Sequence, residues 1–451
     1  MKEKKIIIIG AGPTGLGAAY KLSELGYENW EIYERNSYVG GLAASFEDDK
    51  GFTWDVGGHV LFSHFPYFDE MVDKALKNEY LKHERSAWIF QGKNWIPYPF
   101  QNNIRHLEKE QVLECLMGLI ALNKTKEQTQ NFEELIYAIF GEGIAKYFMI
   151  PYNQKVWAHN LKDISTEWIA ERMSVINLEK KKKNVVFQQD EVSWGPNNRF
   201  KFPLKGGTGA IFNGIAKFLT KPIFFNKNLV ECNTQKKVAT FNDGTETNYD
   251  ILINTSPLNV FINNLRGSHE KAQDTIKGVV YNSGLIIGHG VKKKLKSNKC
   301  WIYFPEQLYP FYRVTYFSNY SPNNVPRGDT DTYCSIMSEV SYPVGSKVNE
   351  AQIKEETVKG LIKSGILEEK ERENIVSEYS IGISHSYPVP TIGRNRALDY
   401  IHPYLENMGI FSRGRFGGWK YEIGNMDHST MQGVELINRI VSGEKETVWA
   451  G

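Results

Sequence analysis

The pattern of hydrophobic and polar positions changes along the chain, and its first part predicts a βαβ unit. A continuous apolar run over Lys5–Ile9 is typical of a buried central strand, and Trp30–Tyr33 predicts a second strand. Between them, Leu16–Leu25 has the spacing of a helix that ends at Gly26. We therefore expect two parallel strands joined by a helix at the start of the chain.

The second part of the pattern is helical. Residues 66–79 and 104–175 are rich in Leu, Glu, Lys and Ala at helical spacing, with few turn residues. One face of the longer segment is apolar with an amphipathic period. That face comprises Phe132, Leu135, Ile136 and Ile139. The pattern predicts a helical region inserted after the first unit.

From about residue 198 the pattern favours strands. Residues 276–342 alternate β-branched and aromatic side chains, which predicts an antiparallel sheet. Nine of the twenty residues from Trp301 to Tyr320 are aromatic, so we expect one face of this sheet to line a cleft. Shorter signals predict a hairpin at Asn242–Gly244, a strand at Ile251–Asn254, and helices at Glu350–Ser364 and Thr430–Val441.

The charge balance limits the kinds of partner. The net charge of +2 comes from 54 basic and 52 acidic residues, so no overall field draws the chain to nucleic acid or to a membrane. The apolar run before Gly10 is too short for a signal peptide, and Val112–Leu122 is too short to span a bilayer. We expect no nucleic-acid partner and no membrane insertion, and local arginines must hold any anionic ligand.

Cysteine usage indicates a reducing compartment. Cys115, Cys232, Cys300 and Cys334 are far apart and form no CxxC or Cys/His spacing, so we expect no metal site. Reduced cysteines are typical of a cytoplasmic protein, which is the location we expect.

A glycine motif follows the first predicted strand. Residues Gly10–Gly15 read GxGxxG and open a helix, an arrangement that brings backbone N–H groups and a helix N-terminus to a pyrophosphate. Glu34 ends the second strand, where a carboxylate accepts hydrogen bonds from ribose hydroxyls. The pair Gly40-Gly41 follows, which a nicotinamide dehydrogenase has no reason to carry. Together these features resemble the FAD fingerprint of the amine-oxidase and glutathione-reductase superfamily.

Further motifs extend over nearly the whole chain. They are Trp54–His64, Pro97–Asn103, Pro151–Trp157, Trp194–Asn197, Gly206–Gly209, Lys299–Pro305, Phe311–Arg313, Ser412–Gly417 and Tyr421–Ser429. Glycine-rich cofactor motifs recur in many flavoenzymes, but the motifs on the substrate side do not. On these segments the chain is similar to the UDP-galactopyranose mutases of the eukaryotic type.

The resemblance implies an isomerase of galactofuranose biosynthesis that interconverts UDP-galactopyranose and UDP-galactofuranose. Such an enzyme uses FAD in its reduced form, with NADPH or NADH as reductant, and flavin N5 acts as a covalent nucleophile on the anomeric carbon. The protein positions the sugar and stabilises the departing diphosphate. The partner implied is therefore a nucleotide sugar.

The resemblance also assigns catalytic residues. Arg313 and Arg415 match the two arginines that bind the diphosphate, for which a planar guanidinium is suited. His59 matches the histidine whose loop, with Gly57 and Gly58, lies against the flavin. For His64 and His428 the sequence does not decide between a structural role and a role in the site.

Two larger sets of residues follow from the same likeness. The expected cofactor-binding residues are Gly10, Gly12, Pro13, Thr14, Gly15, Glu34, Arg35, Gly40, Gly41, Leu42, Gly57, Gly58, His59, Gly414, Gly424, Asn425, Asp427 and Ser429. The expected substrate-binding residues are Tyr98, Phe100, Gln101, Asn153, Trp157, Arg172, Asn197, Trp301, Tyr303, Arg313, Tyr387, Arg415, Tyr421 and Asn425.

Other functions stay open at this point. A mutase for a related nucleotide sugar, such as one of arabinopyranose, N-acetylgalactosamine or another hexose, would use the same chemistry, and the contacts that discriminate between them contribute about 1–3 kcal/mol. An FAD-dependent amine or protoporphyrinogen oxidase shares the first motif, but it favours an apolar cage without paired arginines. A flavin-binding scaffold would not need pocket residues in three regions. The oligomeric state is also open.

The expected fold is α/β, with a Rossmann-like FAD-binding domain, an inserted helical domain and an antiparallel β-sheet substrate domain. This architecture rests on the family likeness, and the periodicity agrees with it. The expected boundaries are 1–82, 203–275 and 403–451 for the discontinuous FAD domain, 105–202 for the helical domain, and 83–104 with 276–402 for the sheet domain.

Overall fold

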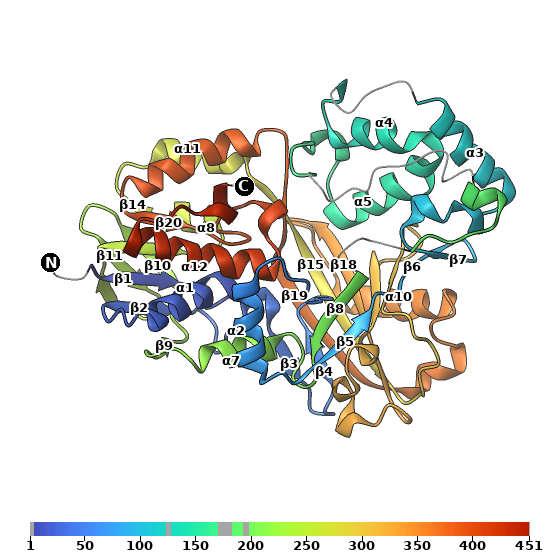
Figure 1. Ribbon diagram of the computed structural model, residues 1–451, viewed down its shortest axis with the longest axis horizontal. Helices are drawn as coiled ribbons and strands as arrows, with labels where there is room; N and C mark the ends of the chain where they lie inside the picture. The colour runs from blue at the N-terminus through green and yellow to red at the C-terminus, as the bar shows by residue number, and fades with distance from the viewer. Residues whose placement is uncertain (1–3, 123–127, 170–182, 193–197, 451) are drawn as a thin grey trace.

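The computed structural model describes residues 4–122, 128–169, 183–192 and 198–450. Its first sheet has five parallel strands in the order β20-β13-β1-β2-β9 (Figure 1). These are β1 (Ile6–Ile9), β2 (Trp30–Tyr33), β9 (Ile223–Phe224), β13 (Ile251–Asn254) and β20 (Ile410–Ser412). The predicted parallel unit is confirmed, and distant parts of the chain complete its sheet.

Helices cover one face of this sheet. α1 (Pro13–Glu24) and α12 (Met426–Ser442) pack against each other over it. They approach closely because glycine stands at the contact: a Cβ on Gly433 would lie 2.1 Å from the carbonyl oxygen of Thr14. α2 (Pro66–Leu76) and α7 (Gly209–Ala216) extend the same core.

The opposite face of the parallel sheet packs on three helices and a second sheet. The helices are α8 (Leu258–Asn263), α9 (Glu270–Thr275) and α11 (Arg394–Glu406). The second sheet has the order β12-β11-β10-β14, with β10 (Leu229–Asn233), β11 (Val238–Phe241), β12 (Glu246–Asn248) and β14 (Leu265–Arg266). β11 and β12 are antiparallel around residues 242–244, so the predicted hairpin is confirmed.

The third large sheet has seven strands in the order β19-β15-β18-β17-β16-β6-β7. They are β6 (Ala87–Gln91), β7 (Asn94–Pro97), β15 (Val280–Val291), β16 (Trp301–Tyr303), β17 (Arg313–Tyr316), β18 (Cys334–Pro343) and β19 (Ile375–Val389). All neighbours are antiparallel except β16 and β6. The antiparallel sheet predicted within 276–342 is confirmed, whereas the sequence pattern did not predict β19, whose serines and Glu378 interrupt its apolar pattern.

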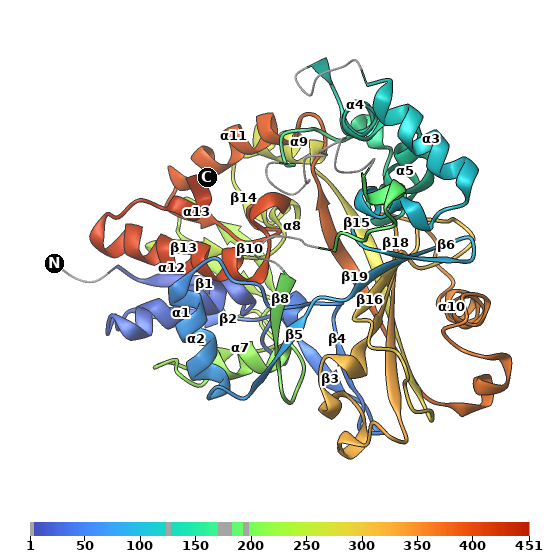
Figure 2. The ribbon, with the colours of Figure 1, turned by 45° about the vertical axis from the view of Figure 1, so that its right-hand side comes forward.

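A helical layer lies over one end of this sheet, as Figures 1 and 2 both show. It contains α3 (Lys109–Ile120), α4 (Phe132–Ile144) and α5 (Ile150–Trp157). The apolar face predicted around Phe132 and Leu135 forms its core, since both side chains are at most 2% exposed. α10 (Glu350–Lys363) lies on the other side of the sheet and confirms the helix predicted at 350–364.

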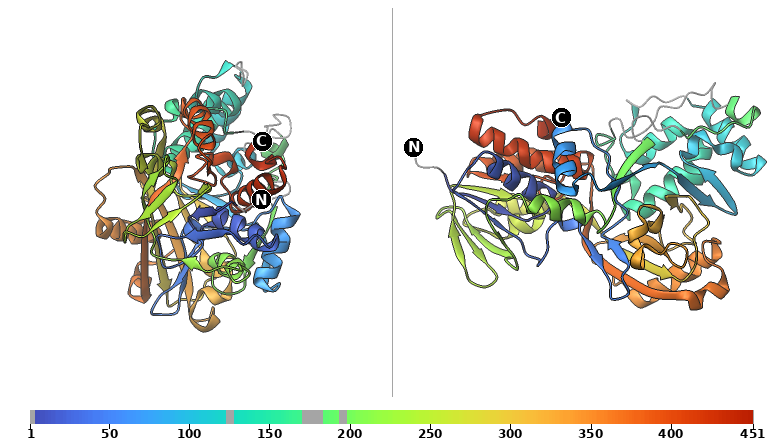
Figure 3. Two further views of the ribbon diagram at one scale, coloured as in Figure 1. Left: turned by 90° about the vertical axis from the view of Figure 1, so that its left-hand side faces the viewer. Right: turned by 60° about the horizontal axis from the view of Figure 1, so that its bottom comes forward.

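Two short strand pairs connect these parts. β5 (Tyr80–Glu84) pairs with β8 (Arg199–Pro203), where the chain leaves the first unit and returns to it. β3 (Ser45–Glu47) pairs with β4 (Thr53–Asp55), whose Trp54 stacks on Tyr379 of β19 at 5.9 Å. Figure 3 shows the parallel-sheet part beside the seven-stranded sheet and its helices. The expected boundaries at 82 and 203 fall within the β5–β8 pair, and the division into domains stays a prediction.

The α/β class, with a parallel sheet of the nucleotide-binding type and an antiparallel sheet, is confirmed. Over the ranges that the structure describes, none of the helices has the length and apolar character needed to cross a bilayer.

Candidate active site

A cavity of about 1250 Å³ lies where the parallel sheet meets the seven-stranded sheet. Its walls come from distant parts of the chain. They include the loop after β1, the end of β2, residues 56–64, residues 255–257, Arg313 of β17, β19, and the segment from Arg415 to the start of α12. A cavity of this size, lined by a glycine loop and also by arginines and tyrosines, can hold a dinucleotide and a second ligand.

The glycine loop forms the nucleotide end of the cavity. A Cβ on Gly15 would lie 1.9 Å from the carbonyl oxygen of Gly10, so this glycine permits helix α1 to pack on the strand. A Cβ on Gly12 would meet nothing within 4 Å and would occupy the cavity. The backbone at Gly12 is therefore accessible to a phosphate at the N-terminus of α1.

Glu34 ends β2 and is only 4% exposed. Its carboxylate accepts hydrogen bonds from the backbone N–H of Ala11 at 2.7 Å and from that of Asn36 at 2.9 Å. The carboxylate thus holds the glycine loop against the end of the second strand and still faces the cavity. This is the place at which a ribose would be held in a bound dinucleotide.

Most of the expected cofactor-binding residues line this cavity. Those that do are Gly10, Gly12, Pro13, Thr14, Glu34, Arg35, Gly41, Leu42, Gly58, His59, Gly424, Asn425, Asp427 and Ser429. Gly15, Gly40, Gly57 and Gly414 lie behind this lining, where they shape the backbone. The open space at Gly12 and the size of the cavity fit an FAD molecule.

The start of α12 carries a hydrogen-bonded group of three side chains. Asp427 is 1% exposed, and its two carboxylate oxygens lie 2.7 Å from Nδ1 of His64 and 3.0 Å from Nδ1 of His428. Burial opposes ionisation of this carboxyl, but the hydrogen bonds from His428 and His64 hold the pKa of Asp427 below its ordinary value. The three groups are close enough to hold a metal ion, yet their hydrogen bonds already satisfy both carboxylate oxygens.

Arg313 lines the cavity, and a carboxylate compensates its charge. Glu339 lies opposite Arg313 on β18 and is 2% exposed. Nη2 of Arg313 donates to one Glu339 oxygen at 2.7 Å, and Nε donates to the other. The Tyr312 hydroxyl also donates to Glu339 at 2.8 Å, and the N–H of Gly58 does so at 3.3 Å. Glu339 therefore ties Arg313 to the glycine-histidine loop.

His59 belongs to this loop of residues 57–59, and the charges of both Arg415 and Arg313 act on it. Burial, and next the positive charge of Arg415, lower the pKa of His59 to about 4. Its imidazole is neutral at pH 7. Nδ1 is buried and has no hydrogen-bond partner among the residues that the structure describes. Such a nitrogen facing the cavity wall fits a ligand that supplies the missing partner.

Arg415 lines the cavity beside two tyrosines. Its guanidinium carbon lies 4.9 Å from the ring centre of Tyr387 and 5.7 Å from that of Tyr421. Nη1 donates to the carbonyl oxygen of Gly424 at 3.1 Å, whereas the buried Nε has no partner within the described part of the chain. The remaining N–H groups are suited to an anionic ligand.

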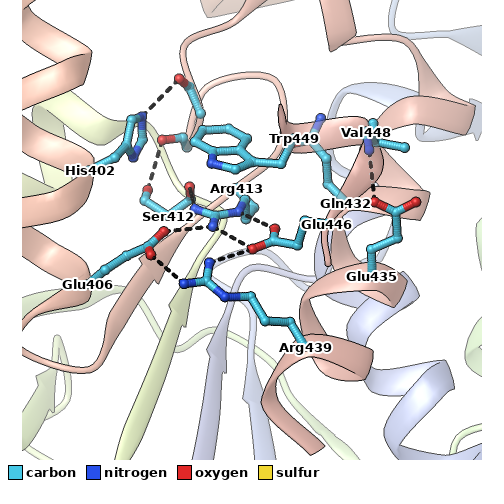
Figure 4. Close-up of polar contacts among 12 residues, drawn as sticks. His402, Glu406, Ser412, Arg413, Gln432, Glu435, Arg439, Glu446, Val448 and Trp449 are labelled. Carbon is cyan, nitrogen blue, oxygen red and sulfur yellow. Dashed lines mark hydrogen bonds and ion pairs between the residues drawn. The ribbon is translucent and has the colours of Figure 1, made fainter. Parts of the chain in front are cut away.

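A buried ion network holds the loop that carries Arg415 (Figure 4). Arg413, with no exposed surface, donates to Glu446 at 2.7 and 2.8 Å and to Glu406 at 2.7 Å. Arg439 binds the same two carboxylates at 2.7 and 2.9 Å. The ring of Trp449 covers Arg413 at 4.0 Å. This network fixes the backbone two residues before Arg415.

The expected substrate-binding residues divide into three groups. Arg313, Tyr387, Arg415, Tyr421 and Asn425 line the cavity. Tyr98, Phe100, Gln101, Asn153, Trp157, Trp301 and Tyr303 lie outside its lining. Arg172 and Asn197 lie outside the described residues.

Aromatic contacts connect the second group to the cavity. Trp157 packs edge-on against Tyr421 at 4.9 Å, and Tyr98 lies 5.0 Å from Tyr303. Phe100 has no exposed surface and stacks on Phe148 at 4.9 Å, so it belongs to the core of the helical layer. These side chains form an aromatic layer behind the cavity wall.

Sequence reasoning missed three charged residues of the site. Glu339 is one, and its signal is a carboxylate within an otherwise uncharged strand. Arg85 is another: it lines the cavity, and its guanidinium lies 5.1 Å from the rings of Tyr98 and of Trp301. Glu422 is the third and forms a bidentate pair with buried Arg394 at 2.8 Å, which no local pattern indicates.

The chain is similar to flavoenzymes over most of its length. The family described as flavin containing amine oxidoreductase matches residues 13–361. The crystal structure of a reduced UDP-galactopyranose mutase superimposes with a TM-score of 0.96 and 42% sequence identity, covering 100% of this chain and 97% of that one. A putrescine oxidase bound to putrescine has a TM-score of 0.65 at 13% identity over 97% of this chain and 99% of that one, a likeness of fold alone.

Two curated relatives match over short segments of the chain. A zeta-carotene desaturase of Capsicum annuum is 33% identical over 90 residues, which are 20% of this chain and 15% of the desaturase. A 15-cis-phytoene desaturase from the same plant is 28% identical over 138 residues, which are 31% of this chain and 23% of that relative.

Proposed function

Because the chain belongs to the flavin-containing amine oxidoreductase family and, within it, to the UDP-galactopyranose mutases, we propose that it is a flavin-dependent isomerase that interconverts UDP-galactopyranose and UDP-galactofuranose. One observation carries the proposal: a likeness at 42% identity over the whole chain, with Arg313 and Arg415 on the wall of a single cavity. A nucleotide sugar has a diphosphate for the arginines and flat groups for the tyrosines.

FAD is the proposed cofactor, held by the glycine loop, Glu34 and the start of α12. When bound in its reduced form, it supplies a nucleophilic nitrogen, N5, for the anomeric carbon of the sugar. NADPH or NADH is the proposed reductant. The open space at Gly12 and the unpartnered Nδ1 of His59, within the described residues, support a flat ligand along this wall.

The residues of this chain hold the diphosphate while the sugar changes form. Negative charge develops on the diphosphate when its bond to the sugar breaks, and guanidinium groups near that oxygen lower the free energy of the transition state. Arg313 uses two of its five N–H groups on Glu339, which leaves others for phosphate oxygens. Arg415 is oriented by Tyr387 and Tyr421. His59, neutral at pH 7, adds no charge to this pair.

Two alternatives make different use of the same cavity. A mutase for a related nucleotide sugar would differ by a few contacts around the sugar, worth about 1–3 kcal/mol. An amine or protoporphyrinogen oxidase would favour an apolar cage, and Arg313 and Arg415 on the wall do not suit one.

The test is product formation by the reduced protein. Dithionite-reduced holoprotein is incubated with UDP-galactopyranose, UDP-arabinopyranose and UDP-N-acetylgalactosamine, and furanose products are separated by chromatography. We expect UDP-galactofuranose from the reduced form and none from the oxidised form. Turnover of only one of the other two nucleotide sugars would assign the enzyme to that substrate instead. Equal turnover by the oxidised form would contradict the use of N5 as a nucleophile.

We also propose a cytoplasmic location, supported by the thiol state of all four cysteines, each of which is buried.

A further inference from the structure

One buried lysine connects the helical layer to the loop that precedes Arg313. Lys155 lies on α5 and is 9% exposed. Its ammonium donates to four backbone carbonyl oxygens, those of Phe304 at 2.9 Å, Glu306 at 3.0 Å, Tyr309 at 2.9 Å and Phe311 at 2.6 Å. None of these acceptors is a carboxylate. All four belong to the connection between β16 and β17, which ends at Arg313.

Burying the Lys155 ammonium without a carboxylate partner is unfavourable unless the four carbonyl groups gain hydrogen bonds from it. A charged ammonium loses hydration when it is buried, and neutral dipoles compensate that loss less well than a carboxylate does. Burial accordingly lowers the pKa of Lys155 to about 7, while the negative charge of Glu306 acts in the opposite direction. Three N–H groups serve four oxygens, one of which, that of Glu306, also accepts the backbone N–H of Tyr309 at 3.3 Å. The side chain therefore organises a turn that backbone hydrogen bonds support only in part.

A second buried side chain connects the end of the same helix to Tyr387, which also lines the cavity. Asn282 on β15 is 1% exposed, and its amide donates to the carbonyl oxygens of Val156 at 2.8 Å and Trp157 at 3.1 Å. Its carbonyl oxygen accepts from the backbone N–H of Tyr387 at 2.8 Å. Helix α5 is therefore fixed to the connection that precedes Arg313 and to the backbone of Tyr387, although neither Lys155 nor Asn282 lines the cavity.

We propose that Lys155 is a positioning residue for the site: by binding the carbonyl groups of residues 304–311 it keeps Arg313 in place on the cavity wall, and it thereby couples the helical layer to diphosphate binding. The proposal rests on the proposed function for the identity of the ligand. It does not need Lys155 to touch that ligand.

Three variants test the proposal in the flavin-bound protein. Lys155→Met removes the donors at similar length, Lys155→Arg keeps a charged donor, and Lys162→Met alters a nearby lysine whose side chain is 66% exposed. Flavin content and the visible spectrum show whether each variant holds its cofactor. Affinity for UDP is then measured well below the melting temperature.

We expect Lys155→Met to keep its flavin and to bind UDP roughly tenfold more weakly, an effect typical of a residue that acts through another. Lys155→Arg should recover part of the affinity, and Lys162→Met should match the native protein. A Lys155→Met protein with a lower melting temperature but native UDP affinity and native kcat/KM would show a purely structural role and overturn the proposal.

A double-mutant cycle identifies the residue through which Lys155 acts. If it acts through Arg313, then Arg313→Ala weakens UDP binding less in the Lys155→Met background than in the native one, whereas Arg415→Ala weakens it equally in both. Additive effects with Arg313→Ala would overturn the proposal. If Lys155→Met fails to retain flavin, the same cycle is run with Lys155→Arg.

Hydrogen exchange separates this proposal from the proposed function. Without the Lys155 ammonium, the amides of residues 304–312 should exchange faster than in the native protein, while those of α1 stay unchanged. This outcome does not depend on UDP or on isomerisation. Unchanged exchange over 304–312 overturns the positioning role, whereas a native protein that forms no furanose product overturns only the proposed function.

Discussion

Arg313 and Glu339 face each other across the antiparallel strands β17 and β18 and form a bidentate ion pair at the wall of the cavity. Burial opposes the charge of Glu339, but Arg313 and the Tyr312 hydroxyl hold the pKa of this carboxyl below its ordinary value. The pair is therefore ionised at neutral pH. Arg313 is oriented before a ligand arrives, which reduces the entropy that ligand binding must overcome.

Removal of one residue of this ion pair should destabilise the protein, because the other charge stays buried without a partner. We expect Glu339→Gln to lower the free energy of unfolding by about 3–5 kcal/mol, because Arg313 then lacks its counter-ion. Urea unfolding of the flavin-bound protein measures the change.

The matched control for Glu339→Gln removes both charges. An Arg313→Met/Glu339→Met protein should be more stable than Glu339→Gln alone, since replacing a buried ion pair by apolar groups is often neutral. It should nevertheless bind UDP weakly. If Glu339→Gln unfolds at the same urea concentration as the native protein, the Arg313 charge does not depend on Glu339 for its stabilisation, and the prediction is wrong.

Arg415 should matter for turnover without affecting the flavin. We expect Arg415→Ala and Arg313→Ala to keep the flavin. Their kcat/KM should fall by a factor that corresponds to about 2–5 kcal/mol of transition-state stabilisation, as for the loss of a desolvated charge partner. Arg415→Lys should recover little, because a lysine cannot stack between Tyr387 and Tyr421 as a guanidinium does.

The control for the arginine variants is Arg266→Ala, whose side chain is 67% exposed and pairs with Glu231 on the surface. It should turn over at the native rate. Near-native rates for both Arg313→Ala and Arg415→Ala would show that the diphosphate is held elsewhere.

Local patterns were sufficient to predict the parts of the fold that depend on neighbouring residues. The apolar run of β1, the GxGxxG turn and the helix after it follow each other directly, so periodicity and turn chemistry were enough. Glu34 was also predictable, because its distance along the chain from the glycine loop reflects one βαβ unit.

Pairings between distant residues were not predictable in this way. Glu339 meets Arg313 only because β17 and β18 are neighbours, and Lys155 meets its carbonyl groups only because α5 packs on the sheet. The aromatic motif at residues 97–103 shows the same limit. The sequence does not reveal that tertiary packing gives Phe100 no exposed surface.

One buried histidine should limit stability in acid. His289 on β15 has no exposed surface, and neither ring nitrogen has a hydrogen-bond partner among the described residues. Burial, with a smaller effect of Lys354, lowers the pKa of His289 from 6.5 to about 4. Between these values the unfolded chain binds a proton that the folded chain does not, so stability is lost as the pH falls through that range.

We expect His289→Leu to raise the free energy of unfolding by about 1–3 kcal/mol at pH 7, because it removes unpaired buried polar atoms. The gain should increase as the pH falls from 6.5 to 4. The comparison is His106→Leu, which removes a histidine that lies 2.8 Å from Asp190 and should not stabilise the protein. A His289→Leu protein with the native pH dependence of unfolding would show that this histidine is not buried in its neutral form.

Substitution of two glycines of the GxGxxG motif by alanine should affect different properties of the protein. A Cβ at Gly15 would lie 1.9 Å from the Gly10 carbonyl oxygen, so Gly15→Ala must displace backbone and should destabilise the flavin-free protein by about 1–3 kcal/mol or more. A Cβ at Gly12 meets no protein atom within 4 Å, so Gly12→Ala should unfold like the native flavin-free protein.

The effect of Gly12→Ala should appear only when the cofactor binds. The added methyl group occupies the place at which a phosphate would approach the N-terminus of α1, so we expect FAD affinity to fall by roughly 10- to 100-fold, equivalent to about 1.4–2.8 kcal/mol. Fluorescence titration of the flavin-free protein measures this, with Gly278→Ala, also free of neighbours within 4 Å, as the control. Because the two effects occur in different states of the protein, a Gly12→Ala variant that binds FAD with native affinity would place the pyrophosphate away from this loop, whatever Gly15→Ala does to the fold.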